Sequence, residues 1–263
     1  MALKVCFTIE KGGCGKSTSA REFATFFAKK GKRVLLIDLD SQCTLTKMLG
    51  LVPDEYESED GSEGRTIYQV FNGKPISENI IKDVIPGLDF VVGSRGLKIV
   101  DSNGAKKRRD YVILKKALGE VDGKYDLIVC DTPPRTDLVT QNAYSACDGI
   151  IVPFKADAAT IGHVAYVYDV LMDTWEFDNP DLKIFGILIT NFRNIPEGRE
   201  AVEDAMRVAS IWKTRVFDTK IRLSTSISKL YKKQKSVFDD DLPKTMGRDD
   251  YRAFCEEFEK EYM

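Results

Sequence analysis

A short apolar run followed by a glycine-rich loop constrains this chain more than any other part of its sequence. Residues 5–9 read Val-Cys-Phe-Thr-Ile, and residues 10–18 continue Glu-Lys-Gly-Gly-Cys-Gly-Lys-Ser-Thr before a stretch of helical periodicity. A buried strand, a glycine-rich turn and a helix N-terminus in this order form an anion site, because backbone N–H groups surround a phosphate and the helix dipole favours negative charge. The order Gly15, Lys16, Ser17 after the strand predicts a loop that binds nucleotide phosphates.

Short apolar runs alternate with amphipathic stretches of helical length along the rest of the chain, which is typical of a parallel sheet covered by helices. Several of these runs are apolar throughout, as strands buried on both faces require. We expect strands over residues 4–9, 33–38, 88–92, 126–131, 149–154 and 183–190, with a short strand near Val216. We expect helices over residues 17–30, 111–121, 137–146, 159–175, 197–212 and 248–262. The pattern predicts an α/β fold with a doubly wound, mostly parallel sheet, helices on both faces and a single domain over residues 1–263.

Charge is unevenly distributed along a chain whose formal net charge is only −2. An acidic loop covers residues 53–64, a basic segment covers residues 207–237, and an acidic C-terminal helix is expected over residues 247–262. The basic segment contains a single acidic residue, Asp218, so the overall charge conceals a local basic face.

Composition excludes several other classes of protein. Hydrophobic residues make up 43% of the 263 residues, which is ordinary for a packed core and argues against disorder. No run approaches ~20 apolar residues, so we expect no membrane span. The six cysteines lack metal-type pair spacing, so reduced thiols in a cytoplasm are the simplest interpretation.

The additional lysine in the loop, Lys11, indicates a family. The pattern Lys-Gly-Gly-x-Gly-Lys-Ser/Thr resembles the deviant Walker A motif of the ParA/MinD ATPases, which are P-loop NTPases. Residues 35–42, Leu-Leu-Ile-Asp-Leu-Asp-Ser-Gln, resemble the second motif of that family, with Ser41 in place of its usual proline. Residues 125–134, Tyr-Asp-Leu-Ile-Val-Cys-Asp-Thr-Pro-Pro, resemble its Walker B strand. Weaker similarities follow at residues 187–193 and 219–222, so the resemblance extends from residue 4 to about residue 240.

The resemblance implies an Mg²⁺-dependent ATPase, in which phosphoryl transfer requires positioning and charge neutralisation rather than covalent help. Lys16 and the loop glycines should hold the β- and γ-phosphates, Ser17 should ligate Mg²⁺, and Thr18 should reach the α-phosphate. Asn191 is carried over from the family as an adenine contact. The expected nucleotide contacts are Lys11, Gly12, Gly13, Cys14, Gly15, Lys16, Ser17, Thr18 and Asn191.

Three aspartates have expected roles at the same site. Asp131, at the end of its strand, should bind the metal through water, and Asp38 should support the metal shell. Asp40 is the candidate that orients the attacking water, which makes it catalytic together with Lys11 and Lys16. A purely structural alternative stays open for each carboxylate, namely that it caps the helix that follows.

Lys11 has an expected role across a dimer. In the family, this lysine reaches the phosphates of the partner subunit in a homodimer with ATP sandwiched between the protomers. It then acts like an arginine finger.

The end of the chain distinguishes the branches of the family. An acidic C-terminal helix would be repelled by anionic lipid, which argues against the basic membrane anchor of MinD-like proteins. An iron–sulfur reductase needs two cysteines per subunit in the region just after the Walker B strand, and Cys147 is the only candidate there. The ParA type remains: a cytoplasmic, nucleoid-associated ATPase that partitions a plasmid or chromosome with a ParB-like centromere-binding protein.

The resemblance places DNA contacts in the basic segment, where nonspecific phosphate binding is expected. The candidates are Lys213, Arg215, Arg222, Lys229, Lys232 and Lys233. Two alternatives stay open. The lysines could form only a solvated helix face, and the protein could be a nucleotide-switched positioning ATPase that acts on a protein assembly without DNA.

Overall fold

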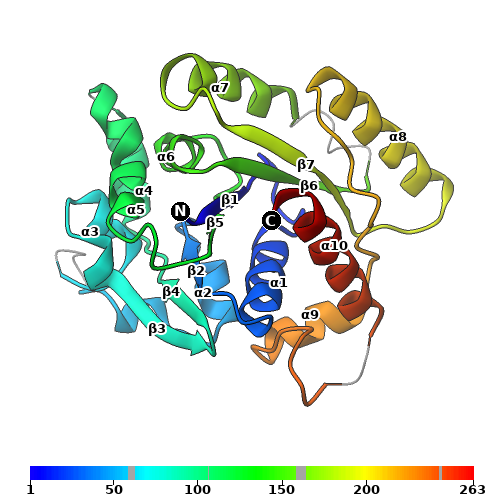
Figure 1. Ribbon diagram of the computed structural model, residues 1–263, viewed down its shortest axis with the longest axis horizontal. Helices are drawn as coiled ribbons and strands as arrows, with labels where there is room; N and C mark the ends of the chain where they lie inside the picture. The colour runs from blue at the N-terminus through cyan, green and yellow to red at the C-terminus, as the bar shows by residue number, and fades with distance from the viewer. Residues whose placement is uncertain (59–62, 106, 158–163, 243–244) are drawn as a thin grey trace.

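A computed structural model describes residues 1–58, 63–105, 107–157, 164–242 and 245–263 of the chain. One seven-stranded sheet runs through it in the order β3-β4-β2-β5-β1-β6-β7 (Figure 1). All neighbouring strands are parallel except β3 and β4. The strands are β1 (Leu3–Phe7), β2 (Val34–Asp38), β3 (Ile80–Ile85), β4 (Leu88–Val91), β5 (Leu127–Asp131), β6 (Gly149–Lys155) and β7 (Lys183–Thr190). This topology confirms the predicted doubly wound, mostly parallel α/β sheet.

Helices cover both faces of the sheet. In Figure 1, α1 and α10 lie on one face, and α6 and α7 lie on the other. The α-helices are α1 (Lys16–Lys29), α2 (Thr44–Met48), α3 (Ile67–Phe71), α4 (Leu97–Asn103), α5 (Ile113–Gly119), α6 (Leu138–Ala146), α7 (Val164–Phe177), α8 (Pro196–Ile211), α9 (Thr225–Lys232) and α10 (Met246–Tyr262).

Alternation along the strands divides the core into two apolar clusters. Val5 and Phe7 of β1 belong to the cluster beneath α1 and α10, whereas Cys6 belongs to the cluster on the opposite face. Phe23 of α1 is the centre of the first cluster, with its ring centroid 5.5 Å from that of Phe7 and 4.9 Å from that of Phe258. Edge-to-face contacts of this kind fix α10 against α1.

Several elements differ from those predicted. The antiparallel edge strand β3 was not expected, because Lys82 and Asp83 interrupt its apolar pattern at a register irregularity. The expected strand near Val216 is only an isolated bridge to Ile187. The helices α2, α3, α4 and α9 were not predicted, because each has at most eight residues, too few for a clear helical period. Parts of the expected helix 159–175 and of the acidic loop 53–64 lie outside the described residues.

The fold brings the three motifs to one edge of the sheet. Because β1, β2 and β5 are parallel neighbours, their carboxyl ends lie together, with Asp131 in register with both Phe7 and Asp38. Ligands of doubly wound folds bind outside this edge.

Candidate nucleotide-binding site

The glycine-rich loop between β1 and α1 adopts a backbone that suits a phosphate. Gly13 and Gly15 have φ of 73° and 80°, the left-handed region in which a side chain would be strained. The Thr190 hydroxyl at the end of β7 donates to the carbonyl of Cys14 at 2.9 Å and anchors the loop. No atom lies within 4 Å of a Cβ added at Gly12 or Gly13, so the loop borders open space among the described residues.

Lys16 is held inside this loop rather than in solvent. Its side chain is 7% exposed, and its Nζ donates to the carbonyl oxygen of Lys11 at 3.0 Å. Burial lowers the pKa of Lys16, and the negative charge of Asp131 opposes that shift. A buried ammonium group with spare donors is suited to bind an anion.

Asp131 is a buried carboxylate with unsatisfied acceptors. It is fully buried at the end of β5, and neither carboxylate oxygen has a hydrogen-bond partner among the described residues. Burial, together with the charge of Asp38, raises the pKa of Asp131 well above its ordinary value, although Ser17 and the charge of Lys16 oppose the shift. Such a group is costly unless a cation or proton compensates it.

The donor set fits Mg²⁺. This ion typically takes one or two carboxylates and completes its shell with substrate phosphates and water. Among the described residues, no group of three or more His, Cys, Asp or Glu is arranged to hold a metal ion. Asp131 and the Ser17 hydroxyl are the residues that would hold the ion.

Asp38 and Asp40 differ in what their carboxylates contact. Asp38 Oδ1 accepts the Asp40 backbone N–H at 3.1 Å, and Oδ2 accepts the backbone N–H and hydroxyl of Thr46 at 2.9 and 2.7 Å. Burial raises the pKa of Asp38 to about 6 despite these bonds. Asp38 therefore fastens α2, which supports the structural alternative for this residue. Asp40, whose Oδ1 accepts the Gln42 N–H at 2.9 Å, lines the cavity over the loop.

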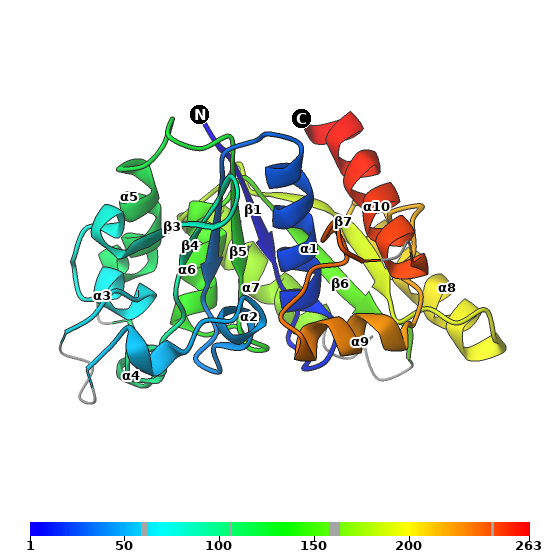
Figure 2. The ribbon, with the colours of Figure 1, turned by 90° about the horizontal axis from the view of Figure 1, so that it is seen from below.

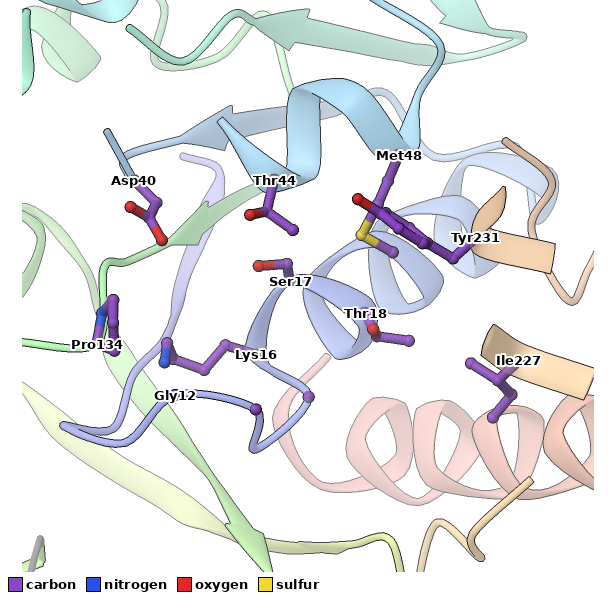
Figure 3. A pocket seen from close by; sticks show the side chains of 12 residues that line it. Gly12, Lys16, Ser17, Thr18, Asp40, Thr44, Met48, Pro134, Ile227 and Tyr231 are labelled. Atoms are coloured by element: carbon purple, nitrogen blue, oxygen red, sulfur yellow. The ribbon is translucent and has the colours of Figure 1, made fainter. Parts of the chain in front are cut away.

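This cavity has a volume of about 490 Å³, within the usual range for small-molecule sites. Figure 3 shows Lys16, Asp40 and Pro134 at one end and Met48, Ile227 and Tyr231 at the other, with Ser17 and Thr18 between them. The lining residues are Gly12, Gly13, Gly15, Lys16, Ser17, Thr18, Asp40, Thr44, Met48, Pro134, Ile227 and Tyr231.

The sequence analysis missed the apolar end of this cavity. Met48 lies on α2, and Ile227 and Tyr231 lie on α9, two helices that were not predicted. The one available signal was the four-residue spacing of Ile227 and Tyr231, which places two large apolar side chains on one face of a helix.

Two of the expected nucleotide contacts, Lys11 and Asn191, do not line the cavity, and neither does the buried Cys14. Lys11 forms an ion pair with Asp157, which follows β6 in the same chain. Asn191 follows β7 in a left-handed conformation with φ of 53°, and it is not among the described residues that line the cavity. Both roles stay predictions.

The expected DNA contacts fall into two groups. Arg215 pairs with Glu257 and Glu261 of α10, and Arg222 pairs with Asp250 of α10 through contacts of 2.6 and 3.0 Å. The other four, Lys213, Lys229, Lys232 and Lys233, are exposed. The last three lie on or directly after α9, which borders the same edge of the sheet as α2 in Figure 2.

None of the helices in the described ranges combines the length and the apolar character that crossing a membrane requires.

Known proteins resemble this chain over most of its length. Residues 3–184 match the family model of an AAA domain. The chromosome-partitioning ATPase Soj of Thermus thermophilus is 29% identical over 259 residues, covering 97% of this chain and 94% of the relative. A Borrelia burgdorferi structure described as a plasmid partition protein, bound to AMPPNP, superposes with a TM-score of 0.79 at 25% identity, covering 99% of both chains. Cobyrinic acid a,c-diamide synthase of Mycobacterium smegmatis, solved with an ATP analog and magnesium, gives a TM-score of 0.79 at 25% identity, covering 97% of this chain and 93% of that one.

Proposed function

Because the chain belongs to the ParA/MinD-type P-loop ATPases, we propose that it is an Mg²⁺-dependent ATPase that dimerises around ATP and partitions a plasmid or chromosome. The observation that carries the ATPase part is the unsatisfied, buried carboxylate of Asp131 beside the glycine-rich loop and Lys16. We further propose that residues 1–263 form one ATPase domain and that a ParB-like protein is the partner. The names of the relatives support the partition part.

Each residue of the site has a separate role in converting ATP and water to ADP and phosphate. Lys16 and the N–H groups of the loop hold the phosphate oxygens, and Ser17 and Asp131 hold the metal. Mg²⁺, when bound, neutralises charge on the phosphates. Asp40, whose carboxylate borders the cavity, orients the attacking water. Asp38 maintains the position of Asp40 by accepting the backbone N–H of Asp40.

Completion of the site requires a second copy of the chain in this proposal. Lys11 contacts Asp157 of its own chain in the monomer, so it has to leave that ion pair to reach the phosphates of a partner. The side chains of this pair are 14% and 33% exposed, and in the dimer the phosphates of the partner's nucleotide would replace Asp157 as the counter-charge of Lys11.

We propose that the exposed lysines carry the DNA contacts. Lys229, Lys232 and Lys233 lie at the outer side of α9, and Lys213 lies after α8. Arg215 and Arg222 are neutralised by acidic residues of α10, so they contribute less to phosphate binding than the sequence suggested. Two protomers would then neutralise about five phosphates, with a slope of log affinity against log salt of roughly −4 to −5.

A second candidate function is a nucleotide-switched positioning ATPase that acts on a protein assembly without DNA. The observation that favours it is the same neutralisation of Arg215 and Arg222, in a chain whose net charge is −2. The reduced positive field would weaken any nonspecific attraction to DNA.

Fluorescence anisotropy on an arbitrary duplex separates the two candidates. The partition ATPase should bind with ATP and Mg²⁺ but not with ADP, with equal affinity for unrelated duplexes and the salt slope given above. Absence of ATP-dependent binding at low salt, in a chain that hydrolyses ATP, would favour the protein-assembly switch instead.

A further inference from the structure

The loop that carries Asp40 closes in a tight turn after β2. The carbonyl oxygen of Asp40 accepts the backbone N–H of Cys43 at 2.8 Å. Ser41 and Gln42 are therefore the two central residues of a β-turn. The Asp40 carboxylate belongs to the same turn, because its Oδ1 accepts the Gln42 N–H at 2.9 Å. Cys43, which follows, has a left-handed backbone with φ of 52°, a conformation that persists only where the surroundings hold it. The direction of the Asp40 carboxylate thus depends on how firmly this turn is held.

A side chain from a distant part of the sequence contacts this turn. Arg135 Nη2 donates to the hydroxyl oxygen of Ser41 at 3.3 Å, across a separation of 94 positions in the chain. Ser41 is buried, so little water reaches the hydroxyl to replace the guanidinium as its partner. A hydrogen bond from a charged donor is stronger than one between neutral groups.

Two carboxylates fix the guanidinium in turn. Arg135 Nη2 also donates to Asp101 Oδ2 of α4 at 3.3 Å, and Arg135 Nε pairs with the carboxylate of Asp137. Asp137 is the N-cap residue of α6, and Asp101 Oδ1 accepts the backbone N–H of Val139 in the first turn of that helix at 3.2 Å. A planar guanidinium that is paired on two edges has little freedom to turn away from Ser41.

A short, stiff segment connects Arg135 to the end of β5, where the carboxylate proposed to hold the metal lies. Two consecutive prolines, Pro133 and Pro134, precede Arg135, and each fixes its own backbone φ. The Thr132 hydroxyl, directly before them, donates to a carbonyl of β1 at 3.0 Å. Pro134 lines the same cavity as Asp40 (Figure 3). The segment after β5 is therefore a firm support for Arg135.

We infer that Arg135 is a positioning residue for hydrolysis, which holds the turn of the water-orienting Asp40 through the hydroxyl of Ser41. It acts through Ser41 rather than on the nucleotide, and it joins the turn after β2 to the segment after β5. The two carboxylates proposed to orient the water and to hold the metal then keep a fixed relation to each other. The inference rests on the proposed ATPase function, because it takes Asp40 to orient the water.

The alternative is a purely structural role, in which Arg135 only stabilises the start of α6 through Asp101 and Asp137. The two roles predict different results at Ser41. Ser41→Ala removes the hydroxyl that Arg135 contacts and leaves both ion pairs in place. A loss of turnover in this variant is expected only if the contact with the turn matters.

Proline provides an independent way to hold the same turn. Ser41 is the first of its two central residues, the position at which proline is favoured in the common turn types. Its φ is not left-handed, and its backbone N–H donates to no acceptor among the described residues. Ser41→Pro should therefore fit the turn and make it less dependent on Arg135.

Steady-state ATP hydrolysis and titration calorimetry, both with Mg²⁺ and the whole chain, test the inference. Arg135→Ala and Ser41→Ala should each lower kcat by about tenfold or more, the range for loss of a hydrogen bond to a charged group, and should leave ATP affinity unchanged. The double variant that combines Ser41→Pro with Arg135→Ala should recover most of the turnover that Arg135→Ala loses.

Arg33→Ala is the matched control. Arg33 is also an exposed arginine that pairs with a carboxylate, that of Asp126, but it directly precedes β2, at the opposite end of that strand from Asp40. This variant should leave kcat and ATP affinity unchanged, because it removes a comparable ion pair far from the turn.

Three results would overturn the inference while leaving the proposed function in place. The first is the kcat of the natural chain in Arg135→Ala or in Ser41→Ala. The second is a double variant that is no more active than Arg135→Ala. The third is weaker ATP binding in Arg135→Ala, since a residue that positions the water acts after the nucleotide has bound. A natural chain that hydrolyses no ATP would overturn the proposed function and the inference together.

Discussion

Asp38 and Asp131 end neighbouring parallel strands in direct register, and both are fully buried, yet their carboxylates differ in hydrogen bonding. Thr46 and the backbone of Asp40 satisfy Asp38, whereas Asp131 has no hydrogen-bond partner among the described residues. The hydrogen-bond donors near these two strand ends therefore bind Asp38, and the carboxylate of Asp131 is left to bind a ligand. Two carboxylates with the same sequence context at a strand end therefore have different roles.

Asp131→Asn should separate stability from ligand binding. The neutral amide removes a carboxylate whose charged form is disfavoured by burial, so the ligand-free protein should melt higher, by about 2–4 °C for each kcal/mol recovered. The further rise in melting temperature caused by Mg²⁺ and ATP should be lost. Thermal unfolding with and without the ligands measures both effects.

Asp126→Asn is the control for that experiment. Asp126 directly precedes β5, five residues before Asp131, but it is half-buried and paired with Arg33, which lowers its pKa to about 2. Loss of this pair should slightly destabilise the protein and leave the ligand effect intact. A ligand-free Asp131→Asn protein that melts lower than the natural chain would contradict the assignment of Asp131 as a carboxylate awaiting a cation.

Lys16→Ala should abolish tight ATP binding. A desolvated, charge-assisted contact is worth ~2–3 kcal/mol or more, which corresponds to a loss of about 30-fold or greater. Calorimetry with ATP and Mg²⁺ measures it, and unchanged affinity would exclude Lys16 as the phosphate anchor.

Asp40→Ala and Lys11→Ala should both lose turnover but differ in assembly. Asp40→Ala should bind ATP and accumulate as an ATP-bound dimer, since only the positioning of water is lost. Lys11→Ala should fail to complete the dimer site and remain monomeric. Size-exclusion chromatography with ATP and Mg²⁺ distinguishes the two, and the reverse pattern would exchange their roles.

Charge reversal on α9 should affect DNA binding more than removal of Arg222. Lys229→Glu and Lys232→Glu should weaken binding uniformly across DNA sequences and flatten the salt slope, while ATP-dependent dimerisation persists. Arg222→Ala should instead lower the melting temperature, because it leaves the carboxylate of Asp250 without its partner. Anisotropy measured at several salt concentrations, with ATP, compares the three variants. If Arg222→Ala weakened DNA binding as strongly as the α9 variants, the division between exposed lysines and paired arginines would be wrong.

Asp101 should make the stability of the ligand-free protein depend on pH. Burial and the charge of Asp137 raise the pKa of Asp101 from its ordinary value of 3.8 to about 7. The folded chain therefore keeps a proton that the unfolded chain releases between these values, so stability falls as pH rises from about 4 to about 7. Asp101→Asn should remove this part of the pH dependence, and urea unfolding at pH 5 and pH 8 measures it. An identical pH dependence in the two proteins would show that Asp101 titrates normally.

The local order of the chain determined much of the fold. Strand, glycine loop and helix are consecutive around Lys16, and the strands that end at Asp38 and Asp131 are short apolar runs, so hydrophobic periodicity and turn chemistry are sufficient to predict them. The prediction failed for β3 and for α9. Their few residues carry mixed patterns, and packing against neighbours decides their conformation.

The tertiary structure alone decided which side chains meet. Thr18 and Tyr231 share one cavity although more than two hundred positions separate them, and Arg222, which precedes α9, is neutralised by Asp250 of α10. Sequence patterns report the propensity and charge of a residue, but the electrostatic state of a buried or paired group depends on the atoms around it. The candidate phosphate site was therefore predictable from the sequence, because it is local, whereas the apolar wall of the cavity and the neutralised arginines became evident only once α9 and α10 were placed against the sheet.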